Sequence, residues 1–260
     1  MRRRLGQHFV ADTNLIEMIV RESGAGPDDV VLEVGGGGGA LTERLAPRVR
    51  RLQVIEFDER LRGELEAVAA EHGNVELVWA DALRIDLGTI EPAPVKVVSN
   101  LPYSIATPLI LKTIEELPGV RSWTLLVQRE IAERLRAAPG SRTYAAPSVL
   151  VQLAADVEIL RGVDRAVFSP RPRVDSVLLA LRRRGPAAPE PVRRLVHEAF
   201  AHRRKALARS LELAASPEER DGRRDAARAA LAEAGLREDA RAESLSPEDF
   251  VRLASSLQAH

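Results

Sequence analysis

The amino-acid sequence predicts an α/β fold in which a doubly wound, Rossmann-like sheet is followed by a small C-terminal all-helical domain. Short β-branched runs alternate with helical stretches through the first 184 residues, as parallel strands joined by crossover helices require. After the linker GPAAPEP at residues 185–191, the chain is rich in Ala, Arg and Glu with helical spacing. We therefore expect a sheet domain at residues 1–184 and a helical domain at residues 192–260.

The expected strands are short runs rich in β-branched and other apolar residues. Five of them form the parallel sheet, at residues 30–34, 52–56, 75–79, 95–99 and 123–128. Two later runs, near residues 157–160 and 176–181, are expected to add an antiparallel edge. A first helix is expected between an Asp12 cap and a Gly24 stop, with an apolar face made by Leu15, Ile16, Ile19 and Val20.

Composition narrows the class of protein. A hydrophobic content of 45% in 260 residues is enough for a packed core, and no apolar stretch approaches the length of a membrane span. The absence of cysteine excludes disulfides, thiolate zinc sites and cysteine nucleophiles, and it fits a reducing compartment. No apolar signal core follows the first residues. We expect a monomeric, cytoplasmic protein that uses no membrane and no metal.

The formal net charge of zero hides an uneven distribution. Residues 25–99 carry 8 basic and 14 acidic side chains, whereas residues 121–184 carry 12 arginines and 6 acids, and residues 193–209 carry 6 basic side chains and 1 acid. A polyanion would favour the basic half of the chain. The expected RNA phosphate contacts are Arg171, Arg173, Arg203, Arg204 and Lys205, with Arg182 to Arg184 and Arg2 to Arg4 as further candidates.

Asn100, Leu101, Pro102 and Tyr103 have a chemistry that suits methyl transfer to an amino nitrogen of a flat base. They follow an apolar run, so they are expected at the carboxyl end of a buried strand, where open α/β sheets bind ligands. The Asn100 amide oxygen and the Pro102 carbonyl can accept both hydrogens of an exocyclic amine and orient its lone pair. Tyr103 offers an aromatic face for the base. The simpler interpretation is a strand-to-helix turn with Tyr103 in the core.

A run of five glycines that begins at Gly35 follows the first expected strand. Glycines let the backbone approach a ligand closely, and Glu56 ends the second strand 21 residues later, placed to accept hydrogen bonds from a ribose diol. These features alone also fit a dinucleotide-binding oxidoreductase, because Gly35, Gly37 and Ala40 satisfy its fingerprint. Asp81, after the third strand, favours S-adenosylmethionine, whose adenine amino group it can bind, although Asp81 could simply cap a helix.

Taken in order, the strand-end residues Glu33, Glu56, Asp81 and Asn100 predict a class I methyltransferase sheet. Over nearly its full length the chain also resembles the small-subunit ribosomal RNA adenine-N6,N6-dimethyltransferases of the KsgA type. The matching motifs include GQHFV at residues 6–10, the glycine run, the residues from Asn100 to Tyr103, FSPRPRVDS at 168–176, FAHRRKAL at 200–207 and RAESLSPEDF at 241–250. The last two favour this branch over the related resistance methyltransferases, which act on large-subunit RNA.

The resemblance implies S-adenosylmethionine as the cofactor and a role for each matched residue. The implied cofactor-binding residues are His8 and Val10, which close over the cofactor, Gly35, which contacts it, Glu56 at its ribose, Asp81 at its adenine, and Asn100 between it and the target base. Phe168 would stack on that base opposite Tyr103. Alternatively, Phe168 only fills a gap in the core.

The same resemblance implies an assembling small ribosomal subunit and its rRNA as the partner. Two adjacent adenosines near the 3′ end of that RNA would each receive two methyl groups at N6, with no general base and no metal. A non-catalytic ribosome-assembly factor on the same fold is the main alternative, and a nicotinamide oxidoreductase is another. The family usually has Pro at the position of Gly36, which predicts a more flexible glycine loop in this chain.

Overall fold

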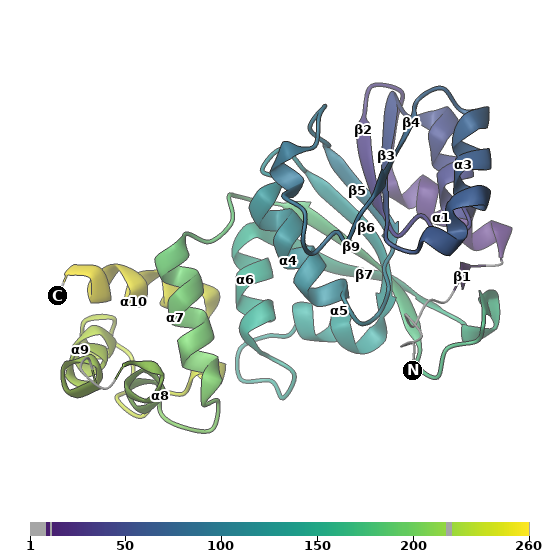
Figure 1. The fold of residues 1–260 in the computed structure, drawn as a ribbon. Helices are drawn as coiled ribbons and strands as arrows, with labels where there is room; N and C mark the ends of the chain where they lie inside the picture. The colour runs from purple at the N-terminus through teal and green to yellow at the C-terminus, as the bar shows by residue number, and fades with distance from the viewer. Residues whose placement is uncertain (1–8, 11, 217–219, 260) are drawn as a thin grey trace. The chain divides into compact units, whose positions relative to one another are not determined.

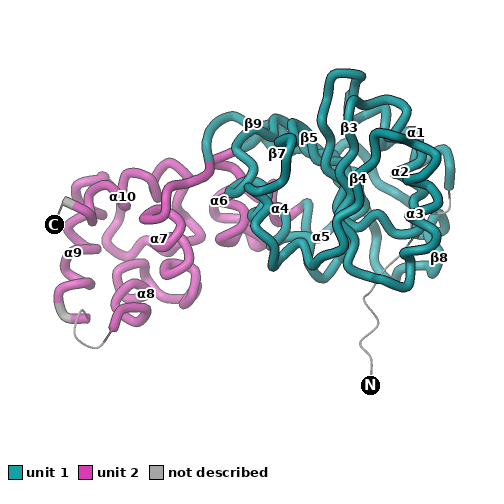
Figure 2. The backbone as a smooth tube through the Cα atoms, turned by 45° about the horizontal axis from the view of Figure 1, so that its top comes forward, with its two compact units in different colours: residues 1–132, 155–186 teal, residues 133–154, 187–260 magenta. Residues whose placement is uncertain are grey.

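The computed structural model describes residues 9–10, 12–216 and 220–259, and in these the chain forms two compact units. The first unit combines residues 1–132 with residues 155–186, and the second combines residues 133–154 with residues 187–260 (Figure 2). The second unit thus includes a segment, residues 133–154, that lies inside the sheet domain expected from the sequence. We describe each unit separately.

A seven-stranded mixed sheet forms the centre of the first unit (Figure 1). Its strands, in spatial order, are β4 (Val75–Trp79), β3 (Arg51–Glu56), β2 (Val30–Val34), β5 (Lys96–Asn100), β6 (Ser122–Gln128), β9 (Ser176–Arg183) and β7 (Ala155–Val163). The first five are parallel, and β9 runs antiparallel to both of its neighbours. The five expected parallel strands and the expected antiparallel pair are therefore confirmed.

Helices cover both faces of this sheet, as the doubly wound prediction requires. Figure 1 shows α1 (Thr13–Ser23) and α3 (Arg62–Glu71) on one side and α4 (Ala106–Glu116) on the other. The short α2 (Ala40–Leu45) follows β2 and contacts α1 and α3, and α5 (Arg129–Leu135) follows β6. Single turns of 3-10 helix lie at Ala46–Arg48, Glu59–Leu61, Leu87–Thr89 and Arg165–Val167.

The first helix begins and ends as its sequence predicts. Asp12 Oδ1 accepts hydrogen bonds from the backbone N–H groups of Asn14 at 2.8 Å and Leu15 at 3.1 Å, which satisfies two of the helix's unpaired donors. Gly24 ends the helix in the left-handed conformation at φ 56°. The predicted apolar face, Leu15, Ile16, Ile19 and Val20, is buried in the core.

A two-stranded ribbon joins two segments that are far apart in the sequence. In it, β1 (Phe9–Val10) pairs antiparallel with β8 (Phe168–Ser169), so that Phe9 lies opposite Ser169 and Val10 opposite Phe168. The sequence did not predict this ribbon, because two residues are too few to show the alternation that marks a strand. It brings Phe9 and Val10 next to the segment that leads into the loop before β9.

The described residues of the second unit form helices and no strand. Its helices are α6 (Ala146–Ala154), α7 (Glu190–Ala201), α8 (Leu207–Ala214), α9 (Arg220–Glu233) and α10 (Pro247–Ala259), with a 3-10 turn at Ala242–Ser244. Tyr144 anchors residues 133–154 to the C-terminal helices, because its buried hydroxyl donates to the Leu245 carbonyl at 2.9 Å and its ring meets Phe200 edge-on. Phe200 in turn stacks on Phe250, with the ring centres 6.0 Å apart.

None of the helices in the described part of the chain combines the length and the hydropathy that crossing a membrane demands.

Candidate active site

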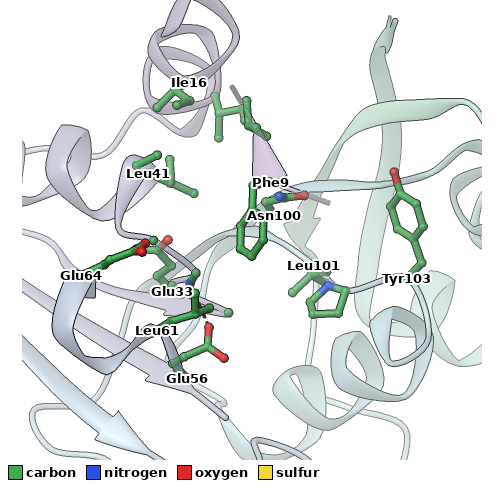
Figure 3. A pocket seen from close by; sticks show the side chains of 18 residues that line it. Phe9, Ile16, Glu33, Leu41, Glu56, Leu61, Glu64, Asn100, Leu101 and Tyr103 are labelled. Carbon is green, nitrogen blue, oxygen red and sulfur yellow. Dashed lines mark hydrogen bonds between the residues drawn. The ribbon is translucent and has the colours of Figure 1, made fainter. Parts of the chain in front are cut away.

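A hollow of about 370 Å³ lies in the sheet unit, where β2, β3 and β5 reach their carboxyl ends. Its walls come from the glycine loop, the acidic strand ends, β1 and the residues just after β5. Figure 3 shows Glu33 and Glu56 on one side of Asn100, and Tyr103 on the other. The carboxyl edge of an open α/β sheet is the usual place for a ligand, and this volume falls in the usual range of about 300 to 1,000 Å³.

The glycine loop passes close to its neighbours. Gly35, Gly37 and Gly39 have φ values of 82°, 59° and 87°, which side chains disfavour. A Cβ atom at Gly35 would lie 3.5 Å from Pro102 Cδ and 3.7 Å from the Asn100 carbonyl oxygen. The loop therefore lies directly against residues 100–103, which we call the NLPY turn.

Gly36 has no room for a side chain. A Cβ atom there would lie 2.5 Å from Val54 Cγ1 and 3.0 Å from Leu65 Cδ2, and both of these side chains are fully buried. Val54 and Leu65 would have to move before a proline could occupy this position. The glycine at position 36 therefore leaves the space that the Val54 and Leu65 side chains occupy next to the loop.

Glu56 accepts backbone hydrogen bonds from the glycine loop and from the two residues that follow β3. Its Oε2 accepts from the Gly37 N–H at 2.9 Å, and its Oε1 accepts from the N–H groups of Phe57 at 2.8 Å and Asp58 at 2.7 Å. The side chain is 4% exposed. A carboxylate offers about four acceptor positions, so these three donors leave it one for a ligand.

Glu33 is a second buried carboxyl group in the wall of the hollow, and it is 1% exposed. Burial is the main reason that its pKa is raised to about 8. The Thr42 hydroxyl donates a hydrogen bond to Glu33 at 2.8 Å, which lowers the pKa, and the nearby Glu56 raises it. Glu33 therefore carries a proton at neutral pH. Glu56 and Glu64 also line the hollow, which is therefore less negative than three ionised glutamates would make it.

A smaller hollow of about 170 Å³ adjoins the first, and the two share Gly35, Glu56 and Pro102 as wall residues. Its far wall includes Phe57, which is 58% exposed, and Asp81. Asp81 also caps the turn that follows β4, because its Oδ1 accepts from the backbone N–H of Leu83 at 3.0 Å. Asp81 therefore caps this turn and also lines the smaller hollow.

The NLPY turn brings three predicted site residues to the first hollow. Asn100 is the last residue of β5, and it lines the hollow together with Pro102 and Tyr103. The Pro102 carbonyl accepts from the Ile105 N–H at 3.1 Å, which leaves its second lone pair for another donor. The Tyr103 phenol is hydrogen-bonded to Ser176 Oγ at 2.6 Å.

Phe168 does not line the hollow in the part of the chain that the structure describes. Its ring is 4% exposed and packs in the core with Leu15, Ile16 and Val163. This is the core-filling alternative that the sequence left open. Stacking on a base opposite Tyr103 stays a prediction, and it requires the ring to leave this core.

The residues expected to close over the cofactor are only partly described. Val10 lines the hollow, whereas His8 lies outside the described residues. The sequence missed Phe9, whose ring also lines the hollow and lies over the glycine loop, 3.2 Å from where a Cβ of Gly37 would be. Its place inside the motif GQHFV was the one available signal.

The predicted RNA-contact residues fall into two groups. Arg171 and Arg173, in the loop before β9, and Arg204 and Lys205, in the helical unit, have exposed side chains. Arg203 is held within the helical unit, because its Nε donates to Glu243 at 2.7 Å and its Nη2 to the Arg142 carbonyl at 2.7 Å.

Arg183 stays a prediction as a phosphate contact, and its guanidinium already has partners within the sheet unit. Its guanidinium lies over the Trp123 ring, 4.9 Å from the ring centre. It donates to the carbonyls of Ile114 at 3.2 Å and Leu117 at 3.0 Å, so its donors serve the sheet unit itself. The further candidates Arg2 to Arg4 lie outside the described residues.

In the described ranges, no cluster of three or more His, Asp or Glu side chains has the arrangement of a metal site.

Comparisons with known proteins agree with this geometry. A family model described as ribosomal RNA adenine dimethylase matches residues 1–259. Two curated relatives are both described as ribosomal RNA small subunit methyltransferase A. The one from Rubrobacter xylanophilus is 43% identical over 255 residues, covering 97% of this chain and 93% of the relative. The one from Thermobifida fusca is 44% identical over 260 residues, covering 96% of this chain and 88% of the relative.

Solved structures give the same picture of the fold. A dimethyladenosine transferase from Plasmodium falciparum aligns with a TM-score of 0.78 at 24% identity, covering 95% of this chain and 96% of that one. At this identity the likeness shows the fold alone. The 23S rRNA methyltransferase ErmE aligns with a TM-score of 0.68 at 30% identity, covering 96% of this chain and 99% of that one.

Proposed function

Because the chain belongs to the ribosomal RNA adenine dimethylase family, we propose that it dimethylates N6 of two adjacent adenosines near the 3′ end of small-subunit (16S) ribosomal RNA, with S-adenosylmethionine as methyl donor. The observation that carries the proposal is that the glycine loop, Glu56 and the NLPY turn line one hollow. The first two suit a nucleoside cofactor, and the turn suits an exocyclic amine. A reaction between the two ligands needs both in one place.

The two adjoining hollows fit an elongated cofactor made of a nucleoside and an amino acid. Glu56 lies where the hollows meet and has one acceptor position left for a ribose hydroxyl. Asp81 and the exposed ring of Phe57 would hold the adenine in the smaller hollow. When bound, S-adenosylmethionine supplies a methyl group that its sulfonium makes electrophilic.

The NLPY turn would orient the target amine. The Asn100 amide oxygen would accept one amine hydrogen and the free lone pair of the Pro102 carbonyl the other, which points the nitrogen lone pair toward the methyl donor. Tyr103 would support the face of the base. The amine becomes acidic as its lone pair is used and loses its proton to solvent, so no side chain has to act as a base.

Exposed basic side chains support an RNA partner. Arg171 and Arg173 are exposed in the loop between β8 and β9, and Arg204 and Lys205 are exposed in the helical unit. Arginine and lysine at such positions bind phosphates and make the affinity depend on salt. The small ribosomal subunit, with its folded RNA, is the partner that we propose for them.

The likeness to ErmE at 30% identity makes large-subunit RNA the second candidate substrate. The test is to incubate the protein with radiolabelled S-adenosylmethionine and, in separate reactions, immature small subunits, mature small subunits, protein-free 16S RNA and protein-free large-subunit RNA. We expect strong labelling of immature small subunits. Labelling of large-subunit RNA alone would move the chain to the resistance branch, and no labelling of any RNA would favour a non-catalytic assembly factor.

A further inference from the structure

One hydrogen bond connects the NLPY turn to a strand that the proposed chemistry does not use. The Tyr103 phenol oxygen and Ser176 Oγ are 2.6 Å apart, and either atom can be the donor. Tyr103 is half-buried, whereas Ser176 is 0% exposed. Ser176 belongs to the motif FSPRPRVDS, but neither the sequence nor the mechanism above gives it a role.

Ser176 is held more firmly than Tyr103. It is the first residue of β9, a strand that lies between two neighbours, and it pairs with Gln128 of β6 on one side and Val163 of β7 on the other. Tyr103 lies in a turn, with the exposed Ser104 after it. The hydrogen bond therefore connects the phenol group of Tyr103, which lies in a turn, to a residue inside the sheet.

The chemistry of the pair suits a permanent contact. Burial raises the pKa of Tyr103, and although the bond to Ser176 lowers it in part, the net shift is upward, so the phenol keeps its proton at working pH. Because the Ser176 hydroxyl is inaccessible to solvent, water does not compete for it. Loss of either group removes this hydrogen bond, which restrains the orientation of the tyrosine ring.

We infer that Ser176 is a positioning residue, which fixes the Tyr103 ring in the orientation that receives the target adenine. The inference rests on the proposed function. It has a particular consequence for the second methyl transfer, because a monomethylated amine keeps a single N–H to donate to Asn100 or Pro102. The orientation of the base then depends more on the ring beneath it, so a loose ring should slow the second transfer more than the first.

The test compares wild type with Ser176→Ala, Tyr103→Phe and the double variant on immature small subunits. For each variant we would measure kcat, KM and, by mass spectrometry, the ratio of monomethylated to dimethylated adenosine. We expect each single change to lower kcat about three- to tenfold, as loss of one hydrogen bond allows, and to raise the monomethyl fraction. The double variant should be no worse than either single variant, because both remove the same bond.

Two controls separate positioning from a general effect on the fold. Ser176→Thr retains the hydroxyl and should restore the dimethyl product. Ser210→Ala removes another fully buried serine hydroxyl, one that donates to the carbonyls of Glu198 and Ala199 in the helical unit. It should change thermal stability without changing the product ratio. Affinity for S-adenosylmethionine, measured by calorimetry, should stay within about twofold of wild type in all variants.

A wild-type product ratio in folded Ser176→Ala would overturn the inference, as would strictly additive losses in the double variant. If Ser176→Ala does not fold, Tyr103→Phe carries the same test, because it removes the bond from the partly exposed side. A wild-type protein that methylates no adenosine would overturn both the proposed function and this inference. If the wild-type protein dimethylates adenosine and the variants do so at the wild-type rate, this inference alone is overturned.

Discussion

Replacing Glu56 should damage both the loop and the cofactor site. Glu56→Ala removes the acceptor for three backbone donors, at 2.9 Å from Gly37, 2.8 Å from Phe57 and 2.7 Å from Asp58. A hydrogen bond to a charged group typically contributes about 1.5 to 3 kcal/mol, and water entering the space can satisfy part of the loss. We therefore expect the free energy of unfolding to fall by about 2 to 4 kcal/mol, which a domain of ordinary stability survives.

The same substitution should lower the affinity for S-adenosylmethionine roughly ten- to a hundredfold, through loss of the ribose acceptor. Denaturant unfolding and calorimetry measure the two effects. Glu64→Ala is the matched control, since Glu64 lines the same hollow but is exposed, and it should change the free energy of unfolding by less than about 0.5 kcal/mol. Wild-type stability in Glu56→Ala would refute the role in the loop, and wild-type affinity in the folded variant would refute the ribose assignment.

Four other variants test the remaining predictions. Asn100→Ala should lower methyl transfer at least about a hundredfold while RNA affinity stays near wild type, measured by labelling and filter binding; retained turnover would contradict the role of Asn100. Arg204→Ala with Lys205→Ala should weaken RNA binding and reduce its salt slope by about 0.7 to 0.9 for each phosphate that the protein no longer neutralises, and an unchanged slope would remove these residues from the interface. Burial raises the pKa of Glu33 to about 8, so the folded state holds a proton that the unfolded chain loses above its ordinary pKa of 4.5. The stability of wild type relative to Glu33→Gln should thus fall by roughly 3 to 5 kcal/mol as the pH rises from about 4.5 to about 8, and parallel stability curves would disprove this. Gly36→Pro should destabilise the fold by about 1 to 3 kcal/mol, because Val54 and Leu65 block the added atoms, and unchanged thermal unfolding would show that they yield freely.

The sheet could be predicted from the sequence because its signals are local. Buried strands such as β2 and β6 are short, mainly apolar runs, and the first helix carries its own cap at Asp12 and its own stop at Gly24. The same holds for the strand ends of the site. In a parallel sheet, Glu56 and Asn100 must meet at one edge once their strands are identified.

The remaining features depend on partners that are distant in the sequence. For Phe168 the sequence left base stacking and core filling open, and its ring is buried on β8, a strand that pairs with the distant β1. The sequence predicted phosphate contacts for Arg183 and Arg203. In the fold, Arg183 donates to a backbone carbonyl and Arg203 to a carboxylate. No spacing rule could have shown that Ser176 meets Tyr103 from 73 residues away.

The most direct test of the proposed function is mass-spectrometric mapping of methylated adenosines in ribosomal RNA from cells with and without this protein. We expect two adjacent N6,N6-dimethyladenosines near the 3′ end of the small-subunit RNA, present with the wild-type protein and absent when it is missing or carries Asn100→Ala. Identical maps with and without the protein, or a difference confined to large-subunit RNA, would contradict it.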